Sequence, residues 1–165
     1  MDIRELNPKD AAIYRELRIE ALTQSPDAFS STLEDALLKP LQATADNLAA
    51  ESAVTFGAFL NGQLVGNMTL LRETGKKLKH RANVLAVYVT PKARGKGIAS
   101  QLMDELVEYA KECGGIEQLY LTVVSSNHSA IQLYEQYGFE KYGTEYRSMK
   151  TDNGYVDEDL MVKFL

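Results

Sequence analysis

A short glycine-rich segment carries the clearest chemical signal in this sequence. It reads Arg94-Gly95-Lys96-Gly97-Ile98-Ala99 and lies between an apolar run and a stretch with helical spacing. Glycines directly before a helix leave several backbone N–H groups unpaired at the positive end of the helix dipole, which suits a phosphate. The segment therefore predicts a phosphate-binding turn. The alternative is a tight connection whose glycines serve only steric needs.

Two common nucleotide-binding patterns do not fit this turn. A P-loop requires a lysine followed by Ser or Thr, but here Lys96 is followed by Gly97. The dinucleotide pattern requires a third glycine where Ser100 stands, and an acid at the end of the next strand, whereas Glu117 precedes that strand. Kinase, NTPase and dinucleotide-dependent chemistry are therefore disfavoured.

The elements around the turn predict how it is held in place. The dense apolar run from Asn83 to Thr90 is typical of a central strand covered on both faces, and Pro91 ends it. After the turn, apolar residues recur at helical spacing from Ile98 to Ala110, and Gly114 stands at the position that ends a helix. The order is strand, glycine-rich turn, helix.

Strand and helix patterns alternate over residues 1–165, which predicts one interleaved α/β domain. Asn61-Gly62 predicts a tight hairpin between two antiparallel strands. The strands expected are Ile3–Leu6, Val54–Leu60, Gln63–Leu71, Asn83–Thr90, Ile116–Val124, Phe139–Glu145 and Val156–Leu165. The helices expected are one capped by Asn7 and ended near Ser25-Pro26-Asp27, two short ones within Leu33–Glu51 broken before Pro40, one from Ile98, and Ser129–Tyr137.

Composition and charge exclude several classes of function. The 165 residues carry a net charge of -5, which disfavours nucleic acid and anionic lipid as partners. Cys113 is the only cysteine, so an internal disulfide and a thiolate metal cluster are excluded. The first residues lack the apolar core of a secretion signal, and no stretch approaches the ~18 apolar residues of a membrane helix. We expect a soluble, cytoplasmic protein.

The turn resembles the acyl-CoA signature of the GNAT superfamily of N-acetyltransferases, Arg/Gln-x-x-Gly-x-Gly/Ala. The matching residues here are Arg94, Gly97 and Ala99. Flanking segments are similar to other cofactor motifs of the superfamily: Val87-Tyr88-Val89-Thr90-Pro91 upstream, and Ser126-Asn127-x-x-Ala130-x-x-Leu133-Tyr134-x-x-x-Gly138-Phe139 downstream. Segments near both ends, from Arg18 to Phe29 and from Asp157 to Met161, are similar to small bacterial-type members.

This resemblance implies an α/β (α+β) fold, a mixed sheet of six or seven strands with about four helices, in which two parallel strands splay apart to admit acetyl-CoA. Backbone N–H groups would hold the pyrophosphate; they belong to the turn Arg94, Gly95, Lys96, Gly97, Ile98, Ala99 and Ser100. The backbone of Val87, Tyr88 and Val89 would bind the pantetheine arm and the thioester carbonyl, and Asn127 would contact pantetheine. No metal is expected.

The resemblance also implies a reaction. An acetyl group would pass from acetyl-CoA to a primary amine of a small molecule or peptide by direct attack, and Tyr134 would protonate the leaving sulfur. Tyr134 lies seven residues after Asn127, about 10 Å further along the same helix face. A non-catalytic acyl-CoA sensor is the alternative, and it would need no such tyrosine. A homodimer is left open.

The main departure from the superfamily concerns the base. Many members carry a glutamate where Thr122 stands, so we expect ordered water or the low pKa of the acceptor itself to account for its deprotonation. His128 is expected to face solvent and Cys113 to be a buried structural thiol. The resemblance places the acceptor pocket between the first helices and the C-terminal strands, with these candidate lining residues: Tyr14, Arg18, Phe29, Tyr146 and Tyr155.

Overall fold

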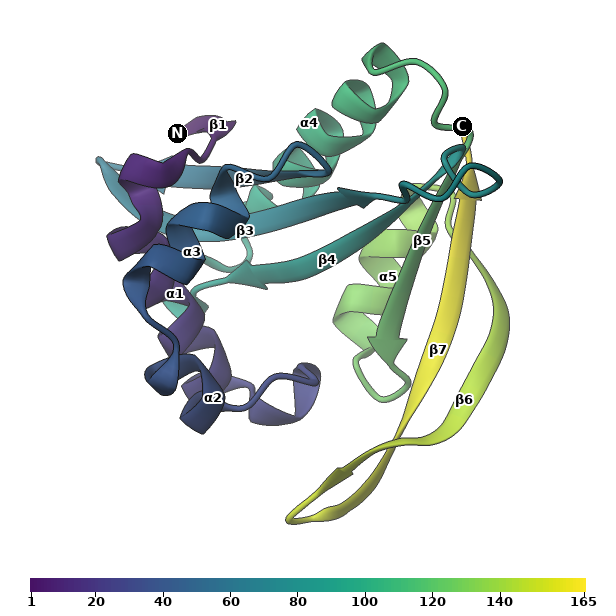
Figure 1. The fold of residues 1–165 in the computed structure, drawn as a ribbon. Helices are drawn as coiled ribbons and strands as arrows, with labels where there is room; N and C mark the ends of the chain where they lie inside the picture. Colours follow the sequence, from purple (N-terminus) through teal and green to yellow (C-terminus); the bar gives the residue numbers. More distant parts are fainter.

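Seven strands form one mixed sheet in the computed structural model, which describes residues 1–165 (Figure 1). The strands are β1 (Asp2–Glu5), β2 (Ala53–Leu60), β3 (Gln63–Arg72), β4 (Arg81–Val89), β5 (Gln118–Val124), β6 (Glu140–Thr151) and β7 (Gly154–Phe164). The α-helices are α1 (Ala11–Gln24), α2 (Leu33–Leu38), α3 (Leu41–Leu48), α4 (Ile98–Glu112) and α5 (His128–Gln136). Helices α1 to α3 lie on one side of the sheet, and α4 and α5 on the other (Figure 1).

The sheet runs in the order β1-β2-β3-β4-β5-β7-β6. Only the β4–β5 pair is parallel; all other neighbours are antiparallel. Asn61 and Gly62 both have positive φ, of 51° and 79°, as a two-residue hairpin turn requires. The mixed sheet and the predicted β2–β3 hairpin are therefore confirmed.

The parallel strands β4 and β5 separate after a short contact. They pair only where Arg81–Asn83 meets Gln118–Tyr120, and β5 continues beside β7. Just beyond the contact, β4 is bulged at Ala86, whose φ is 51°. The fully buried Asn67 of β3 donates its side-chain Nδ2 to the Ala86 carbonyl at 2.5 Å. This bond stabilises the bulge, which increases local twist and bends the strand.

The separation corrects one prediction from the sequence. Residues Asn83–Thr90 were expected to be covered on both faces, but the Leu85 side chain is 42% exposed. The apolar run forms a central strand as expected. Because β5 diverges from it, part of the run faces a cavity instead of the core.

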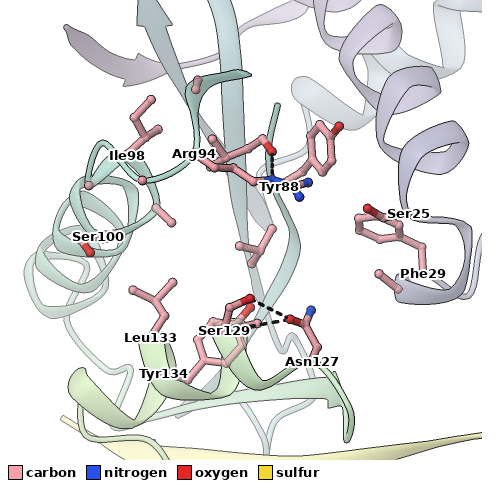
Figure 2. Close-up of a pocket in the computed structure, with 18 residues that line it drawn as sticks. Ser25, Phe29, Tyr88, Arg94, Ile98, Ser100, Asn127, Ser129, Leu133 and Tyr134 are labelled. Carbon is pink, nitrogen blue, oxygen red and sulfur yellow. Dashed lines mark hydrogen bonds between the residues drawn. The ribbon is translucent and has the colours of Figure 1, made fainter. Parts of the chain in front are cut away.

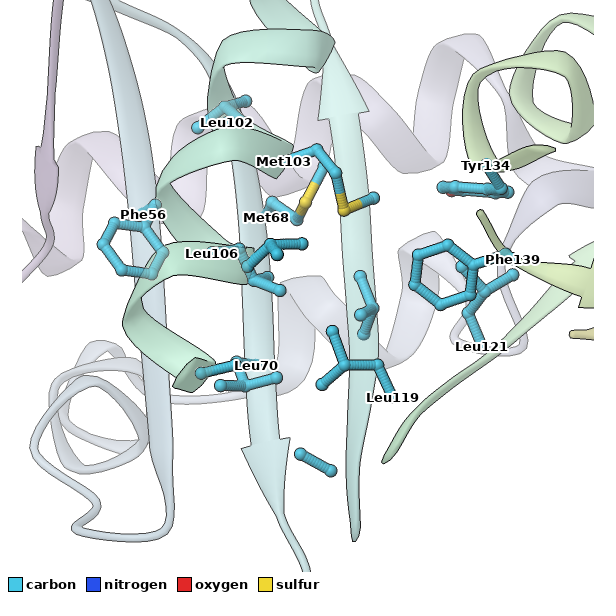
Figure 3. Packing of buried hydrophobic residues seen from close by; sticks show 14 of the residues in the cluster. Phe56, Met68, Leu70, Leu102, Met103, Leu106, Leu119, Leu121, Tyr134 and Phe139 are labelled. Carbon is cyan, nitrogen blue, oxygen red and sulfur yellow. The ribbon is translucent and has the colours of Figure 1, made fainter. Parts of the chain in front are cut away.

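The core lies mainly between α4 and the sheet (Figure 3). Leu102, Met103 and Leu106 of α4 are fully buried, as are Met68 and Leu70 of β3. Full burial of one such side chain contributes about 1.5–3 kcal/mol relative to exposure, so this contact fixes the direction of α4 on the sheet. The start of α4, where the glycine-rich turn lies, is positioned accordingly.

The C-terminal hairpin is longer than the sequence indicated. Strand β6 continues to Thr151 instead of Glu145, and β7 starts at Gly154 instead of Val156. The outer half of this hairpin projects beyond the rest of the sheet (Figure 1). Its side chains are exposed or half-buried and none is buried, so no regular alternation of apolar and polar residues marks it. None of the helices combines the length and apolar character needed to cross a bilayer.

Candidate active site

A cavity of about 420 Å³ opens where β4 has separated from β5 (Figure 2). Its walls come from the end of β4, the start of α4, one face of α5 and the segment from Ser25 to Phe29. All the predicted cofactor and catalytic residues line it except Lys96, which is exposed and lies outside: Val87, Tyr88, Val89, Arg94, Gly95, Gly97, Ile98, Ala99, Ser100, Asn127 and Tyr134.

The glycine-rich turn presents free backbone N–H groups to this cavity. Gly95 and Gly97 have φ of 74° and 73°, a conformation that glycine adopts without strain. The Gln101 amide is bonded to the Gly97 carbonyl, so the helical hydrogen bonds of α4 begin there. The amides of Ile98, Ala99 and Ser100 precede that point and are available to an anion.

The free edge of β4 provides a second set of backbone groups. The Thr90 amide donates to Val65 of β3, so alternation turns the Tyr88 backbone toward β3 and the backbones of Val87 and Val89 toward the open edge. The Val89 carbonyl accepts a hydrogen bond from Arg94 Nε at 2.9 Å. The side chain of Tyr88 is among those lining the cavity, while its backbone is directed toward β3. The Tyr88 hydroxyl donates to Glu20 at 2.9 Å.

Helix α5 brings a polar and an aromatic side chain to the cavity. Asn127 caps the helix, because its Oδ1 accepts from the Ala130 amide at 3.3 Å. Two turns later Tyr134 is only 5% exposed and packs edge-on against Phe139, with ring centroids 6.0 Å apart. Its hydroxyl makes no hydrogen bond within the protein, and burial raises the pKa of Tyr134 to about 12. The residue holds its proton firmly.

A second cavity, of about 470 Å³, adjoins the first and is here called the acceptor cleft. Both cavities are lined by Phe29, Val87, Asn127 and Tyr134. The acceptor cleft extends from there along the outer face of β5, past Thr122, toward β6 and β7. The two cavities therefore meet at Tyr134.

Two carboxylates in the acceptor cleft were not singled out from the sequence. Glu158 of β7 pairs with Val124 of β5 on one side and with Glu145 of β6 on the other, so the three side chains share a face. Ser148 Oγ donates to Glu158 Oε2 at 2.7 Å, while Oε1 has no partner within the protein. Neither glutamate has a cationic partner, since the ion pairs of the molecule lie elsewhere. Only the register of β5, β6 and β7 reveals this arrangement.

The other residues considered for the acceptor pocket divide into two groups. Phe29 lines the acceptor cleft, and Tyr14 and Arg18 line a neighbouring cavity between α1 and α2. Tyr146 and Tyr155 were expected there too, but they are 77% and 57% exposed on the projecting hairpin and line none of these three cavities. That expectation is wrong because the hairpin is longer than predicted.

His128 and Cys113, for which no catalytic role is expected, lie outside the three cavities. His128 is exposed, as expected for the first residue of α5. Cys113 ends α4 and is half-buried, near the hydroxyl of Tyr109. No cluster of His, Cys, Asp and Glu side chains able to hold a metal ion occurs in the structure.

Comparison with known families decides what this fold represents. The sequence matches the acetyltransferase (GNAT) family over residues 13–139. The chain belongs to the GNAT acetyltransferase family. This GNAT chain is 30% identical over 106 residues to the L-amino acid N-acetyltransferase AaaT of Escherichia coli. The aligned residues cover 64% of this chain and 65% of AaaT. The chain is 34% identical over 91 residues to the N-alpha-acetyltransferase RimI of Mycobacterium tuberculosis, covering 55% and 54% of the two chains. The aligned region thus spans less than two thirds of each relative.

Solved structures share the whole GNAT fold. The acetyltransferase of the GNAT family from Streptococcus pneumoniae superposes with a TM-score of 0.87 at 27% identity, covering 99% of this chain and 98% of that one. The yncA protein of Salmonella typhimurium, solved with its cofactor acetyl-CoA, superposes with a TM-score of 0.82 at 19% identity, covering 100% and 94%. The second likeness concerns the fold alone.

Proposed function

We propose that this protein is an N-acetyltransferase that moves an acetyl group from acetyl-CoA to a primary amine by direct attack. The observation that carries the proposal is the meeting of two cavities at one buried tyrosine. One cavity has the backbone groups for an acyl-CoA, and the other is lined by carboxylates that suit a cationic amine. A sensor of acyl-CoA would need the first cavity only.

The residues of the first cavity fit acetyl-CoA on two counts. The free amides at the start of α4 suit a pyrophosphate, and a side chain added at Gly95 or Gly97 would meet no protein atom within 4 Å, so the approach to these amides is open. The open edge of β4 offers hydrogen bonds to the amide groups of a pantetheine arm. In this proposal Val87 and Val89 make those bonds, and Arg94 secures the edge through the Val89 carbonyl.

When bound, acetyl-CoA supplies a thioester open to attack by an amine and a sulfur that leaves as a thiolate. The Val89 N–H faces the open edge of β4, where it can donate to an oxygen that gains negative charge. Asn127 lines both cavities and orients groups at their junction.

Tyr134 holds the proton that the leaving sulfur needs. Its pKa of about 12 lies well above the value near 8.5 of an ordinary thiol. Complete transfer to a thiolate would therefore be uphill by about 5 kcal/mol. Tyr134 consequently acts by donating a hydrogen bond that strengthens as the bond to sulfur breaks, and not by prior ionisation.

Glu158 is the proposed proton acceptor for the amine. It lies one diagonal step across the β5–β7 pair from Thr122, which is where many members of the family carry a glutamate. Its Oε1 is free, and Ser148 fixes the other oxygen. Glu145 beside it adds negative charge that attracts an ammonium group. This assignment differs from the expectation that ordered water or the low pKa of the acceptor itself accounts for the deprotonation.

The acceptor class follows from the same charges. Two carboxylates without a cationic partner favour an amine that arrives protonated. The relatives AaaT and RimI are named for acetylating L-amino acids and N-alpha groups, so an α-amino group is supported as the acceptor.

The test is an acceptor screen with acetyl-CoA, in which release of free thiol is measured. Amino acids, peptides and polyamines form the panel, and mass spectrometry identifies the acetylated product. Amine-dependent thiol release with an N-acetyl product is expected. Tight acetyl-CoA binding without turnover on any amine would favour the sensor instead.

A further inference from the structure

A third cavity, of about 620 Å³, lies between α1 and α2 and is here called the arginine cavity. It touches the acceptor cleft at Ala86, which lines both. The cavity thus extends the acceptor cleft on the side away from Glu158, and nothing in the proposed reaction uses it.

The charges of this cavity are opposite to those of the molecule as a whole. Arg15, Arg18 and Lys39 line it together with a single carboxylate, Asp35. The chain carries a net charge of -5. Neither arginine forms an ion pair, since the ion pairs of the molecule involve other residues. A positively charged cavity on an acidic protein favours an anionic ligand.

Two arginine nitrogens in this region lack a partner although they are buried. Arg15 Nε and Arg18 Nη1 are both inaccessible to solvent and make no hydrogen bond within the protein. A buried donor left unpaired costs about 1–3 kcal/mol, and more when it is charged. Arg15 is at least tethered, because its Nη2 donates to the Leu37 carbonyl at 3.1 Å. The Arg18 side chain makes no hydrogen bond within the protein.

Of the two arginines of this cavity, Arg18 is the one that contacts a residue lining the other two cavities. Its guanidinium lies over the ring of Phe29, 4.9 Å from the centroid, and Phe29 lines both the acetyl-CoA cavity and the acceptor cleft. Stacking on a ring holds the guanidinium plane fixed while its N–H groups stay free to bind a carboxylate in two places.

We propose that the arginine cavity is a carboxylate subsite of the acceptor site, in which Arg18 binds an acid group carried by the amine that is acetylated. The proposal rests on the proposed acetyltransferase function and narrows its substrate class to amino acids and related molecules with both an amine and a carboxylate. The amine end lies toward Tyr134 and Glu158, and the acid end toward Arg18.

The first experiment uses ω-amino acids from glycine to 6-aminohexanoate, each compared with its own methyl ester. We expect the wild-type kcat/KM for the best acid to exceed that of its ester about 10-fold or more. The Arg18→Gln variant should lose about 10-fold for the acid, mainly through KM, and less than about 2-fold for the ester. The variant-to-wild-type ratio cancels the difference in amine pKa between an acid and its ester.

Lys39→Gln is the matched control, because it removes one positive charge from the same cavity without touching a buried nitrogen. It should change the ratio of acid to ester less than about 2-fold. Arg18→Lys keeps the charge, and thermal unfolding of all variants shows that they fold. Equal use of acids and esters by the wild-type protein would overturn the subsite while leaving the acetyltransferase function intact.

A binding measurement separates the two proposals. Calorimetry with the N-acetyl derivatives of the same amino acids needs no turnover. Binding to the wild-type protein that weakens about 10-fold in Arg18→Gln supports the subsite even if none of the amines is acetylated. Equal binding to both proteins overturns it. Inhibition by free acetate that is equal for acids and esters would identify an independent anion site and also overturn the proposal.

Discussion

Tyr134 shows how environment decides what a residue can do. Burial raises the pKa of Tyr134 to about 12, so the hydroxyl is protonated throughout the physiological range. We expect Tyr134→Phe to lower kcat by about 10² while KM for acetyl-CoA stays nearly unchanged, because only the proton is lost. Tyr137→Phe is the matched control. Its hydroxyl lies 2.7 Å from both the Ser100 carbonyl and Asp104 Oδ1, so its one proton is shared between these two acceptors. The pKa of Tyr137 is likewise raised to about 12, chiefly by burial.

Tyr137→Phe should therefore lower the free energy of unfolding, and it should lower kcat less than Tyr134→Phe does. Steady-state kinetics of the two variants measure this difference in kcat. Equal losses of kcat in both would show that Tyr134 acts through packing. A pH profile adds a second check, since Tyr134 should contribute no change of rate below about pH 10.

Glu158 can be tested as the base through the pH dependence of turnover. We expect the wild-type kcat/KM for the acceptor to fall at acid pH, with a limb common to acceptors of different amine pKa. Glu158→Gln should abolish that limb and lower the rate at neutral pH by about 10². Glu145→Gln, directly opposite, removes a charge but not the proposed base, so it should raise KM and keep the limb. A limb that follows the acceptor pKa instead would assign deprotonation to the amine itself.

The candidate residues differed in how readily the sequence revealed them. Tyr134 and Asn127 belong to a local spacing on one helix, so their common face could be predicted. Glu145 and Glu158 are thirteen positions apart in the sequence and lie opposite each other across a hairpin whose register contains irregularities. No local sequence pattern predicts this pairing. Contacts that depend on strand register can be identified only from the structure.

The turn before α4 is the element that the sequence described best. Gly97→Glu should weaken acetyl-CoA binding by about 100-fold or more, because it places negative charge at amides that suit a phosphate. The positive φ of 73° also strains any residue but glycine, by about 1–2 kcal/mol. Gly62→Glu, in the β2–β3 turn with φ of 79° and open space around it, bears similar strain away from the cavity. Calorimetry should show normal acetyl-CoA affinity for that control.

The bulge in β4 makes a prediction about Asn67, which no sequence pattern singled out. Asn67→Leu removes the donor to the Ala86 carbonyl, and we expect a loss of about 1–3 kcal/mol in stability together with a raised KM for acetyl-CoA. Thr55→Val is the comparison, since it removes a hydrogen bond of 2.8 Å to Thr69 between β2 and β3 without contact to β4. Thr55→Val should lower the free energy of unfolding but leave KM for acetyl-CoA unchanged. If KM for acetyl-CoA were unchanged in both variants, the bulge would have no role in cofactor binding.

Whether a helix or strand could be predicted from the sequence depended on whether one of its faces is covered by the core. Helix α4 was found because its apolar stripe faces the core, and the β2–β3 hairpin because Asn61-Gly62 suits its turn. The ends of β6 and β7 were missed because no side chain in that part of the hairpin is fully buried. The course of β4 was missed because an apolar residue such as Leu85 is the same whether it lines a core or a cavity.

The stability of the whole molecule should respond to acid through Asp159. Burial disfavours the charge on this side chain, but hydrogen bonds from Ser125, Lys141 and Thr144 outweigh it, so the pKa of Asp159 lies below its ordinary value of 3.8. A lowered pKa contributes stability above pH 3.8 that is lost as the pH falls through the folded-state value. Asp159→Asn should therefore destabilise the protein by about 1–3 kcal/mol at pH 7.

Urea unfolding at a series of pH values measures this effect. The difference between wild type and Asp159→Asn should shrink below pH 3.8. Glu108→Gln breaks the exposed pair with Lys111 and should change little at any pH. A difference that stayed constant down to strongly acid pH would show that packing, not charge, links β5 to β6 and β7 at this point.

The three cavities draw on different stretches of the chain. The walls that suit acetyl-CoA come mostly from residues 87 to 134, in the middle of the sequence. The walls around the proposed acid end come almost wholly from α1, α2, α3 and the segments between them. The acceptor cleft is also built mostly from the middle of the chain, and it takes Tyr142, Glu145 and Glu158 from the C-terminal hairpin. Substitutions near the two ends of the gene would thus alter Arg18, Glu145 and Glu158, while most of the walls that suit acetyl-CoA stayed unchanged. A change of acceptor at these residues would therefore leave the proposed cofactor cavity in place.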